Sequence, residues 1–166
     1  KMVKYTLISN IPYYITGEFL RKFLESTNPP LKIVVMLQKE VAKRIVDTKE
    51  SILSISVKVY GDAKYVCTVP RKFFRPMPNV DSAVISIENI SKKFFSDTKI
   101  DEKVFFDILK AGFAHKRKVV IRNLEDKIEK QTLENTWLRE KWDRGLRAEE
   151  ISLEMKKKIV GDSCIS

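Results

Sequence analysis

The sequence predicts an α/β protein in which a strand–helix–strand unit and further strands are followed by a small all-α part. Two β-prone runs, residues 5–9 and 32–37, flank a segment with apolar residues at helical spacing, which is the pattern of a parallel crossover unit. Beyond residue 91 the apolar residues recur mainly at helical spacing. A chain of 166 residues with 43% hydrophobic residues has room for one domain and a fraction of another.

The first elements follow from turn residues and apolar spacing. Residues 5–9 (YTLIS) form a strand that ends at Pro12, because proline cannot continue the ladder. Thr16 is expected to cap a helix over 17–26, which ends at the pair of prolines that follows Asn28. Residues 32–37 (KIVVML) are nearly all apolar, which is typical of a strand covered on both faces in a parallel sheet.

The next segments are less uniform. Residues 51–60 alternate apolar and polar side chains and so favour a strand, although Ile52, Ile55 and Val59 also fit one face of a helix. Strands are expected over 64–69 and 82–87. Residues 70–81 contain three prolines and three basic residues, a composition that predicts an ordered loop.

The remainder predicts a helical domain. Residues 91–99 form a polar connector, after which Asp101 is expected to cap a helix. Further helices are expected over 117–128, 133–142 and 152–160, with Trp137 and Trp142 in their core. We therefore expect a β-rich part over 1–90 and a helical part over 91–166.

Charge and cysteine usage narrow the function classes. The net charge of +10 favours a polyanionic partner such as nucleic acid. Cys67 and Cys164 suggest neither a disulfide framework nor a zinc site, and the lone His115 cannot build a metal cluster. No apolar run is long enough to span a bilayer, so a cytoplasmic protein without metal or membrane partner is expected.

Asn10, Ile11, Pro12 and Tyr13 come directly after the first strand. A plain Asn-x-Pro turn explains them equally well. The alternative is catalytic, since the amino group of a nucleobase is a poor nucleophile whose lone pair is delocalised into the ring. The Asn10 side-chain carbonyl and the Ile11 or Pro12 backbone carbonyl would accept both N–H bonds and favour the attacking geometry, while Tyr13 would stack on the extruded base.

A second motif spans residues 71–84 (RKFFRPMPNVDSAV). Aromatic residues beside prolines are often loop anchors in a core. Here they alternate with Arg71, Lys72 and Arg75, a combination expected where bases stack and phosphates are neutralised.

The ordered motifs NIPYYIT, QKEVAKRI, FRPMPNVDSAV and GFAHKRKVVIRNL resemble the RsmA/KsgA family of small-subunit rRNA adenine dimethyltransferases. The resemblance covers nearly the whole chain. It implies a Rossmann-type, S-adenosyl-L-methionine-dependent enzyme that dimethylates two adjacent adenines near the 3′ end of small-subunit rRNA. It also implies a helical C-terminal domain that engages the rRNA of the assembling small ribosomal subunit, a monomeric full-length enzyme, and a helix over 51–60.

The resemblance assigns individual residues by motif match. Asn10, Ile11, Pro12 and Tyr13 correspond to the catalytic loop, where Asn10 also lies against the cofactor. Phe74 corresponds to the aromatic residue that stacks on the target adenine, whereas Phe73 is expected in the core. Gln38 and Glu40 are expected to cap or pack a helix rather than to catalyse.

The sequence also departs from the family. The family's glycine-rich loop and the acidic residues that bind the cofactor are missing, and no two of the five glycines form a GxG pair. The chain therefore resembles the C-terminal half of a Rossmann-type methyltransferase domain followed by a small all-α domain. Its S-adenosyl-L-methionine site is incomplete, and the chain alone is expected to be inactive.

A basic run in the helical part completes the candidate site. Lys116, Arg117, Lys118 and Arg122 are expected on a helix, where such runs usually form a solvated face. In the context of the family a role in phosphate contact is the better interpretation. The alternatives are a noncatalytic rRNA-binding or ribosome-assembly module, and a methylase of the related 23S-type resistance group, which the motifs fit less well.

Overall fold

The computed structural model describes residues 4–163 and divides the chain into two compact units. The first unit comprises the residues up to Thr48 together with Leu53–Lys92. The second comprises Lys49–Ile52 and the residues from Lys93 onward. Each unit has its own set of buried apolar side chains, and the two are described separately below.

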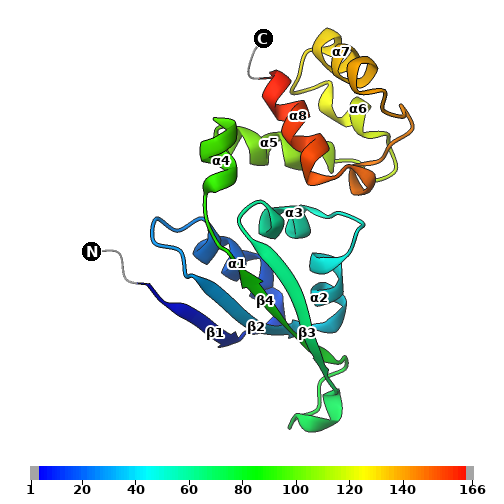
Figure 1. Ribbon diagram of the computed structural model, residues 1–166. Coiled ribbons are helices and arrows are strands. Elements are labelled where there is room, and N and C mark those ends of the chain that lie inside the picture. The colour runs from blue at the N-terminus through cyan, green and yellow to red at the C-terminus, as the bar shows by residue number, and fades with distance from the viewer. Residues whose placement is uncertain (1–3, 164–166) are drawn as a thin grey trace. The chain divides into compact units, whose positions relative to one another are not determined.

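The first unit is built on a four-stranded mixed sheet (Figure 1). Its strands are β1 (Thr6–Asn10), β2 (Lys32–Gln38), β3 (Asp62–Val69) and β4 (Ser82–Glu88), in the spatial order β1-β2-β4-β3. The β1–β2 pair is parallel, as the crossover pattern predicts, whereas β4 runs antiparallel to both β2 and β3. The fold class expected from the sequence is thus present.

Three helices connect or precede these strands: α1 (Thr16–Leu24), α2 (Lys39–Val46) and α3 (Ile52–Lys58). They lie on one side of the sheet, behind its strands in Figure 1. The core between helices and sheet contains Leu20 and Leu24 of α1, Ile45 of α2, and alternate residues of β2 and β4, all nearly inaccessible to water. Burial of this apolar surface is the main force that holds the unit together.

Two expectations for this unit are wrong. Strand β2 is not buried on both faces, since Ile33, Val35 and Leu37 are buried while Val34 and Met36 are only half-buried. Thr16 is not a helix cap but the first residue of α1, and its hydroxyl donates a hydrogen bond to the Tyr13 carbonyl at 3.0 Å. The cap position of α1 is Ile15, the last residue of the 3₁₀ segment Tyr13–Ile15, and no side chain makes a capping bond there.

Within residues 51–60, Ile52–Lys58 form helix α3, so the strand that the alternation favours is wrong and the helix that the family resemblance implies is confirmed, with shorter bounds. Ser54 is as deeply buried as Ile55, so the polar members of the alternation do not face water. In a seven-residue helix the apolar spacing is too short to distinguish a period of 2 from one of 3.6.

The second unit is helical. It contains α4 (Lys93–Thr98), α5 (Glu102–Gly112), α6 (Val120–Leu124), α7 (Lys130–Glu140) and α8 (Leu153–Ser163). Asp101 caps α5 as expected, because its carboxylate accepts a hydrogen bond from the Val104 N–H at 3.0 Å. The expected polar connector over 91–99 instead contains α4, whose Phe95 is buried among the rings of Phe94 and Phe105.

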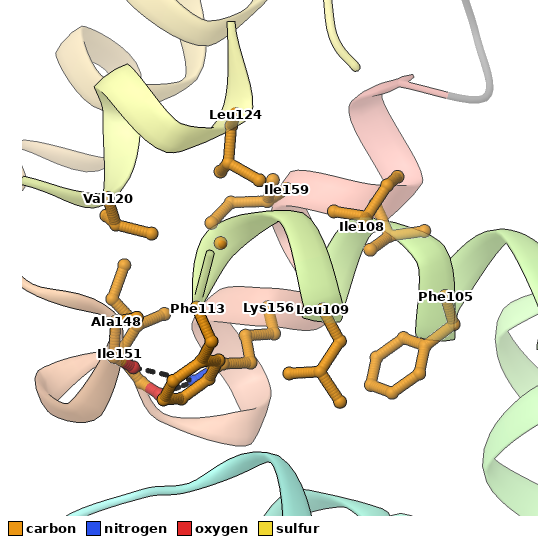
Figure 2. Close-up of a pocket in the computed structure, with 12 residues that line it drawn as sticks. Phe105, Ile108, Leu109, Phe113, Val120, Leu124, Ala148, Ile151, Lys156 and Ile159 are labelled. Atoms are coloured by element: carbon orange, nitrogen blue, oxygen red, sulfur yellow. Dashed lines mark hydrogen bonds between the residues drawn. The ribbon is translucent and has the colours of Figure 1, made fainter. Parts of the chain in front are cut away.

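The helix expected over 117–128 is much shorter than predicted, since α6 begins at Val120 and ends at Leu124. The core of the unit contains a small apolar cavity between α5, α6 and α8 (Figure 2). Lys156 enters this cavity, donates hydrogen bonds to the carbonyls of Ala148 and Ile151, and lies over the Phe113 ring at 5.4 Å. Its ammonium group is thus engaged by the protein itself, and the cavity is a feature of core packing.

Candidate active site

The register of the strands brings three loops to one end of the sheet. Asn10 ends β1, Gln38 ends β2, and Val69 ends β3, while the antiparallel β4 begins there at Ser82. Gln38 lies opposite Ser82, and Ser82 lies opposite Val69. The loop after β1 and the loop between β3 and β4 therefore share this end, and we call residues 10–15 and 70–81 the sheet-end loops. The sequence motifs NIPYY and FRPMPN are thus neighbours in space.

The first sheet-end loop is held in place by one buried side chain and one backbone hydrogen bond. Asn10 is exposed, whereas Ile11 is buried and anchors the loop in the core. Pro12 precedes the 3₁₀ turn, and its carbonyl already accepts a hydrogen bond from the Ile15 N–H at 3.2 Å. Because a carbonyl oxygen has a second lone pair, this bond still permits Pro12 to accept from a ligand.

Tyr13 joins the first sheet-end loop to the start of β4, the residue directly after the second sheet-end loop. Its hydroxyl is hydrogen-bonded to the Ser82 hydroxyl at 2.7 Å, across a sequence separation of 69 residues. Ser82 is completely buried and Tyr13 is half-buried, so this bond fixes the Tyr13 hydroxyl against the start of β4. The neighbouring Tyr14 is 89% exposed, and the sequence analysis did not single it out. The only signal for Tyr14 was the doubling of the aromatic residue after Pro12.

The second sheet-end loop is closed at its base by Asp81. The Asp81 carboxylate accepts a hydrogen bond from the Arg71 backbone N–H at 3.0 Å and another from the Lys39 ammonium at 3.4 Å. These contacts, the backbone bond from Arg71 above all, hold the pKa of the Asp81 carboxyl below its ordinary value. The sequence analysis missed the role of Asp81, which ties the loop to the first turn of α2.

The basic residues of this loop differ in their contacts. The Arg71 guanidinium donates to the Asn79 carbonyl at 3.1 Å, so part of its hydrogen-bonding capacity serves the loop itself. The Lys72 ammonium lies 5.3 Å from the centre of the Phe73 ring. Arg75 is exposed and precedes a cis peptide bond to Pro76.

The environments of Phe73 and Phe74 differ from those expected. Phe73 is 70% exposed, so its expected place in the core is wrong. It belongs to the short 3₁₀ turn Arg71–Phe73, which contains no buried residue. Phe74, the expected stacking residue, is half-buried. Gln38 occupies the cap position of α2 without a side-chain capping bond, and Glu40 lies exposed in the first turn, where a carboxylate is favoured by the helix dipole.

Lys116, Arg117 and Lys118 are exposed but lie in a loop between α5 and α6, not on a helix. We call residues 113–119 the basic loop. It is pinned by the buried Asn123, whose amide donates to the carbonyls of Gly112 at 2.7 Å and His115 at 3.2 Å. These bonds replace helical ones, which explains why α6 begins later than predicted. Arg122 lies on α6 and pairs with Glu125 at 3.3 Å.

The residues present do not by themselves make an S-adenosyl-L-methionine site. In a Rossmann-type site a glycine-rich turn after the first strand of the domain holds the cofactor, and none of the glycines among the described residues forms such a turn. Gly17 has open space around it, and Gly61 packs against the Glu88 carbonyl, where an added Cβ would approach to 2.6 Å. Gly61 precedes β3 and so lies at the opposite end of the sheet from Asn10. The remaining glycines belong to the helical unit.

The described residues provide two further findings. Among residues 4–163, no group of three or more His, Cys, Asp or Glu side chains is placed to hold a metal ion. Within the same range, every helix is too short or too polar to cross a bilayer. Cys67 is exposed as a free thiol, and Cys164 lies outside the described residues.

The sheet and its parallel crossover form a Rossmann-like fold. Two solved structures share it: the 23S rRNA methyltransferase ErmE, with a TM-score of 0.73 and 17% identity, and a dimethyladenosine transferase from Plasmodium falciparum, with a TM-score of 0.72 and 22% identity. The similarity covers 97% and 93% of this chain, and 66% and 65% of those chains, respectively.

The sequence comparisons define the family. The model of the ribosomal RNA adenine dimethylase family matches residues 1–156. The small-subunit rRNA methyltransferase A of Fusobacterium nucleatum is 42% identical over 71% of this chain and 46% of its own length. That of Bacillus cytotoxicus is 38% identical over 89% of this chain and 53% of its own length. The chain belongs to the ribosomal RNA adenine dimethylase family and spans about half the length of these curated relatives.

Proposed function

We propose that the chain supplies the catalytic loop and the RNA-engaging part of a small-subunit rRNA adenine dimethyltransferase. The product would be two adjacent dimethylated adenines near the 3′ end of the RNA. The observation that supports this most is the Tyr13–Ser82 hydrogen bond, which links the NIPYY motif to the serine of the FRPMPNVDSAV motif at the same end of the sheet. A pure turn at Asn10 has no need of this connection.

In this proposal Asn10, Ile11 and Pro12 present carbonyl acceptors to the amino group of the target adenine. Holding its N–H bonds draws the nitrogen out of conjugation with the ring and exposes its lone pair. Tyr13 and Phe74 bracket the extruded base, and the half-buried state of both rings suits a surface that exchanges water for a base.

Methyl transfer requires S-adenosyl-L-methionine, and the proposal assigns most of its binding to residues outside this chain. Asn10 is the residue here that would lie against it. Calorimetry on the 166-residue chain is therefore expected to show negligible binding of S-adenosyl-L-methionine. Micromolar affinity of this chain alone would contradict the assignment.

The RNA contacts in the proposal come from two places. At the sheet end they are Arg71, Lys72 and Arg75, and in the helical domain they are Lys116, Arg117, Lys118 and Arg122. The internal bonds of Arg71 and Arg122 make them weaker candidates than the others. In this proposal the two domains are residues 1–90 and 91–166. The partner is the assembling small ribosomal subunit in the cytoplasm, and the full-length enzyme that binds it is a monomer.

The test uses a chimera in which this chain is fused to the cofactor-binding half of the Fusobacterium nucleatum relative. The chimera is incubated with labelled S-adenosyl-L-methionine and with small-subunit rRNA or small subunits. We expect label in two adjacent adenines, mapped by nuclease digestion and mass spectrometry. Large-subunit rRNA serves as the matched control substrate and should stay unlabelled. Labelling of large-subunit rRNA alone would favour the 23S-type activity, and a folded but inert chimera that still binds RNA would favour a noncatalytic module.

A further inference from the structure

A second surface, distant in sequence from the sheet-end loops, lies along α7. Gln131, Glu134, Asn135 and Leu138 follow one another at helical spacing and line one side of a groove. Lys141 and Trp142, just beyond the helix, continue the lining. We call this surface the α7 groove, and none of its residues belongs to the site described above.

The α7 groove offers exposed apolar and aromatic surface. Leu138 is 81% exposed, which is unusual for a large aliphatic side chain on a helix that also contributes to a core. Trp142 is half-buried and meets the Trp137 ring edge-on, with 5.2 Å between ring centres. The expectation that both tryptophans form the core therefore holds for Trp137, which is 3% exposed, but only in part for Trp142.

Trp137 carries an unmet hydrogen bond. Its indole Nε1 is buried and has no partner among the described residues. An indole N–H can only donate, so what it lacks is an acceptor. A buried donor without a partner is rare in folded proteins and calls for an explanation. Trp137 lines the groove, so a ligand bound there provides the acceptor once the side chains that cover the indole nitrogen move aside.

The polar lining fits an anionic, hydrogen-bonding ligand. Gln131 donates to the Asn135 carbonyl at 3.0 Å, and by its chemistry this pair still offers a Gln131 acceptor and Asn135 donors. Arg144 pairs with Glu134 at the rim, so the Glu134 charge is neutralised within the groove. Lys141 then gives the lining a net positive charge.

The backbone at Lys141 fixes where α7 ends. Lys141 has φ 55° and ψ 39°, in the left-handed region that glycine adopts without steric cost, and Lys99 follows α4 with φ 56°. This helix end places Lys141 directly after α7, where it lines the groove.

We propose that the α7 groove binds an unpaired nucleotide of RNA. The base would lie on Trp142 and Leu138, the amide pair would contact its edge, and Lys141 would neutralise the adjoining phosphate. The Trp137 N–H would donate to an acceptor of the same nucleotide. Aromatic, cationic and amide groups in one groove on a protein of net charge +10 favour RNA over a protein partner. The inference rests on the proposed function in taking RNA as the partner.

The chain contains two tryptophans, and both line the α7 groove, so intrinsic fluorescence reports on it directly. The 166-residue chain is titrated with a single-stranded oligoribonucleotide of about 10 nucleotides and with the duplex of the same sequence. We expect saturable quenching with the single strand and little change with the duplex. Unchanged fluorescence at concentrations where anisotropy shows the single strand to be bound would overturn the proposal.

Two variants separate binding from folding. Lys141→Gly should raise the thermal midpoint, because it relieves the positive φ, yet weaken single-strand binding by roughly 3- to 10-fold. Leu138→Ala should weaken binding by a similar factor. Lys103→Ala and Val104→Ala, at exposed positions of α5, are the matched controls and should bind normally. Normal binding by both groove variants would also overturn the proposal.

Two further outcomes distinguish this inference from the proposed function. If fluorescence changes with protein concentration in the absence of RNA, a second copy occupies the groove and the inference is wrong. If RNA binding depends on Lys116, Arg117 and Lys118 but not on the groove variants, the inference fails while the proposed function stands.

Discussion

The sheet-end loops and the basic loop are both candidate RNA contacts, but they hold their side chains in opposite ways. At the sheet end, two polar side chains are held in place: Tyr13 by its hydrogen bond to Ser82, and Asp81 by the bond that it accepts from the Arg71 backbone. In the basic loop, Asn123 holds backbone carbonyls and leaves the charged side chains of residues 116–118 exposed. Fixed groups suit a reaction geometry, and exposed cations suit attraction of a polyanion.

The largest expected effect concerns Asn10. In the chimera with the cofactor-binding half, Asn10→Ala should lower turnover by about 10²-fold or more, because the lost acceptor acts mainly in the transition state. RNA affinity should change little. Tyr14→Ala, which removes a larger exposed side chain beside the same loop, is the comparison variant. Single-turnover methyl transfer measures the rate, and near-normal turnover by folded Asn10→Ala would leave NIPYY as a plain turn.

The basic loop should affect binding rather than chemistry. Replacing Lys116, Arg117 and Lys118 together with alanine should reduce the slope of log affinity against log salt by about 2, since each lost phosphate contact removes released counterions. Anisotropy titrations at several salt concentrations provide the slope. Replacing Lys93, Lys103 and Lys110 gives a control with the same change in charge. An unchanged slope for the loop variant would assign it to a solvated face.

A substitution beside the cavity of the helical unit should have a smaller effect, and it should stabilise the protein rather than impair it. Gly112 is the last residue of α5, and an added Cβ would meet Val120 at 3.5 Å and Leu124 at 3.7 Å, which are ordinary contacts. Gly112→Ala should therefore stabilise the unit by about 0.5 to 1 kcal/mol, through better packing and lower entropy of the unfolded chain. Urea unfolding measures the change, and destabilisation would mean that the cavity cannot accept a methyl group.

The smallest effect is expected at the opposite end of the sheet. Hydrogen bonds from Lys32 at 2.7 Å and Lys64 at 2.8 Å lower the pKa of Glu88 to about 2. Because the folded pKa lies below the unfolded one, the contribution to stability is present above about pH 4.5 and is lost as pH falls towards 2. Glu88→Gln should flatten the dependence of the urea midpoint on pH in this window. An identical dependence in both proteins would show that the pair contributes nothing measurable.

Much of the fold could be predicted because it follows from local sequence. Strand β2 contains the uninterrupted apolar run from Ile33 to Leu37, and the Asp101 cap precedes its helix in the expected pattern. The candidate site was harder to predict from the sequence than the fold. The Tyr13–Ser82 contact joins residues far apart in the chain, and no local pattern indicates it. The start of α6 depends on the buried Asn123, so a basic segment with good helical propensity becomes a loop.

The central claim is that chemistry belongs to the sheet end and electrostatic attraction to the basic loop. The most direct test measures single-turnover methyl transfer by the chimera as a function of small-subunit RNA concentration, for Asn10→Ala and for the Lys116, Arg117 and Lys118 triple alanine variant. We predict that the triple variant reaches the unmodified rate once RNA saturates, whereas Asn10→Ala stays slow at every RNA concentration. A triple variant that remains slow at saturation, beside an Asn10→Ala variant of normal maximal rate, would contradict the account.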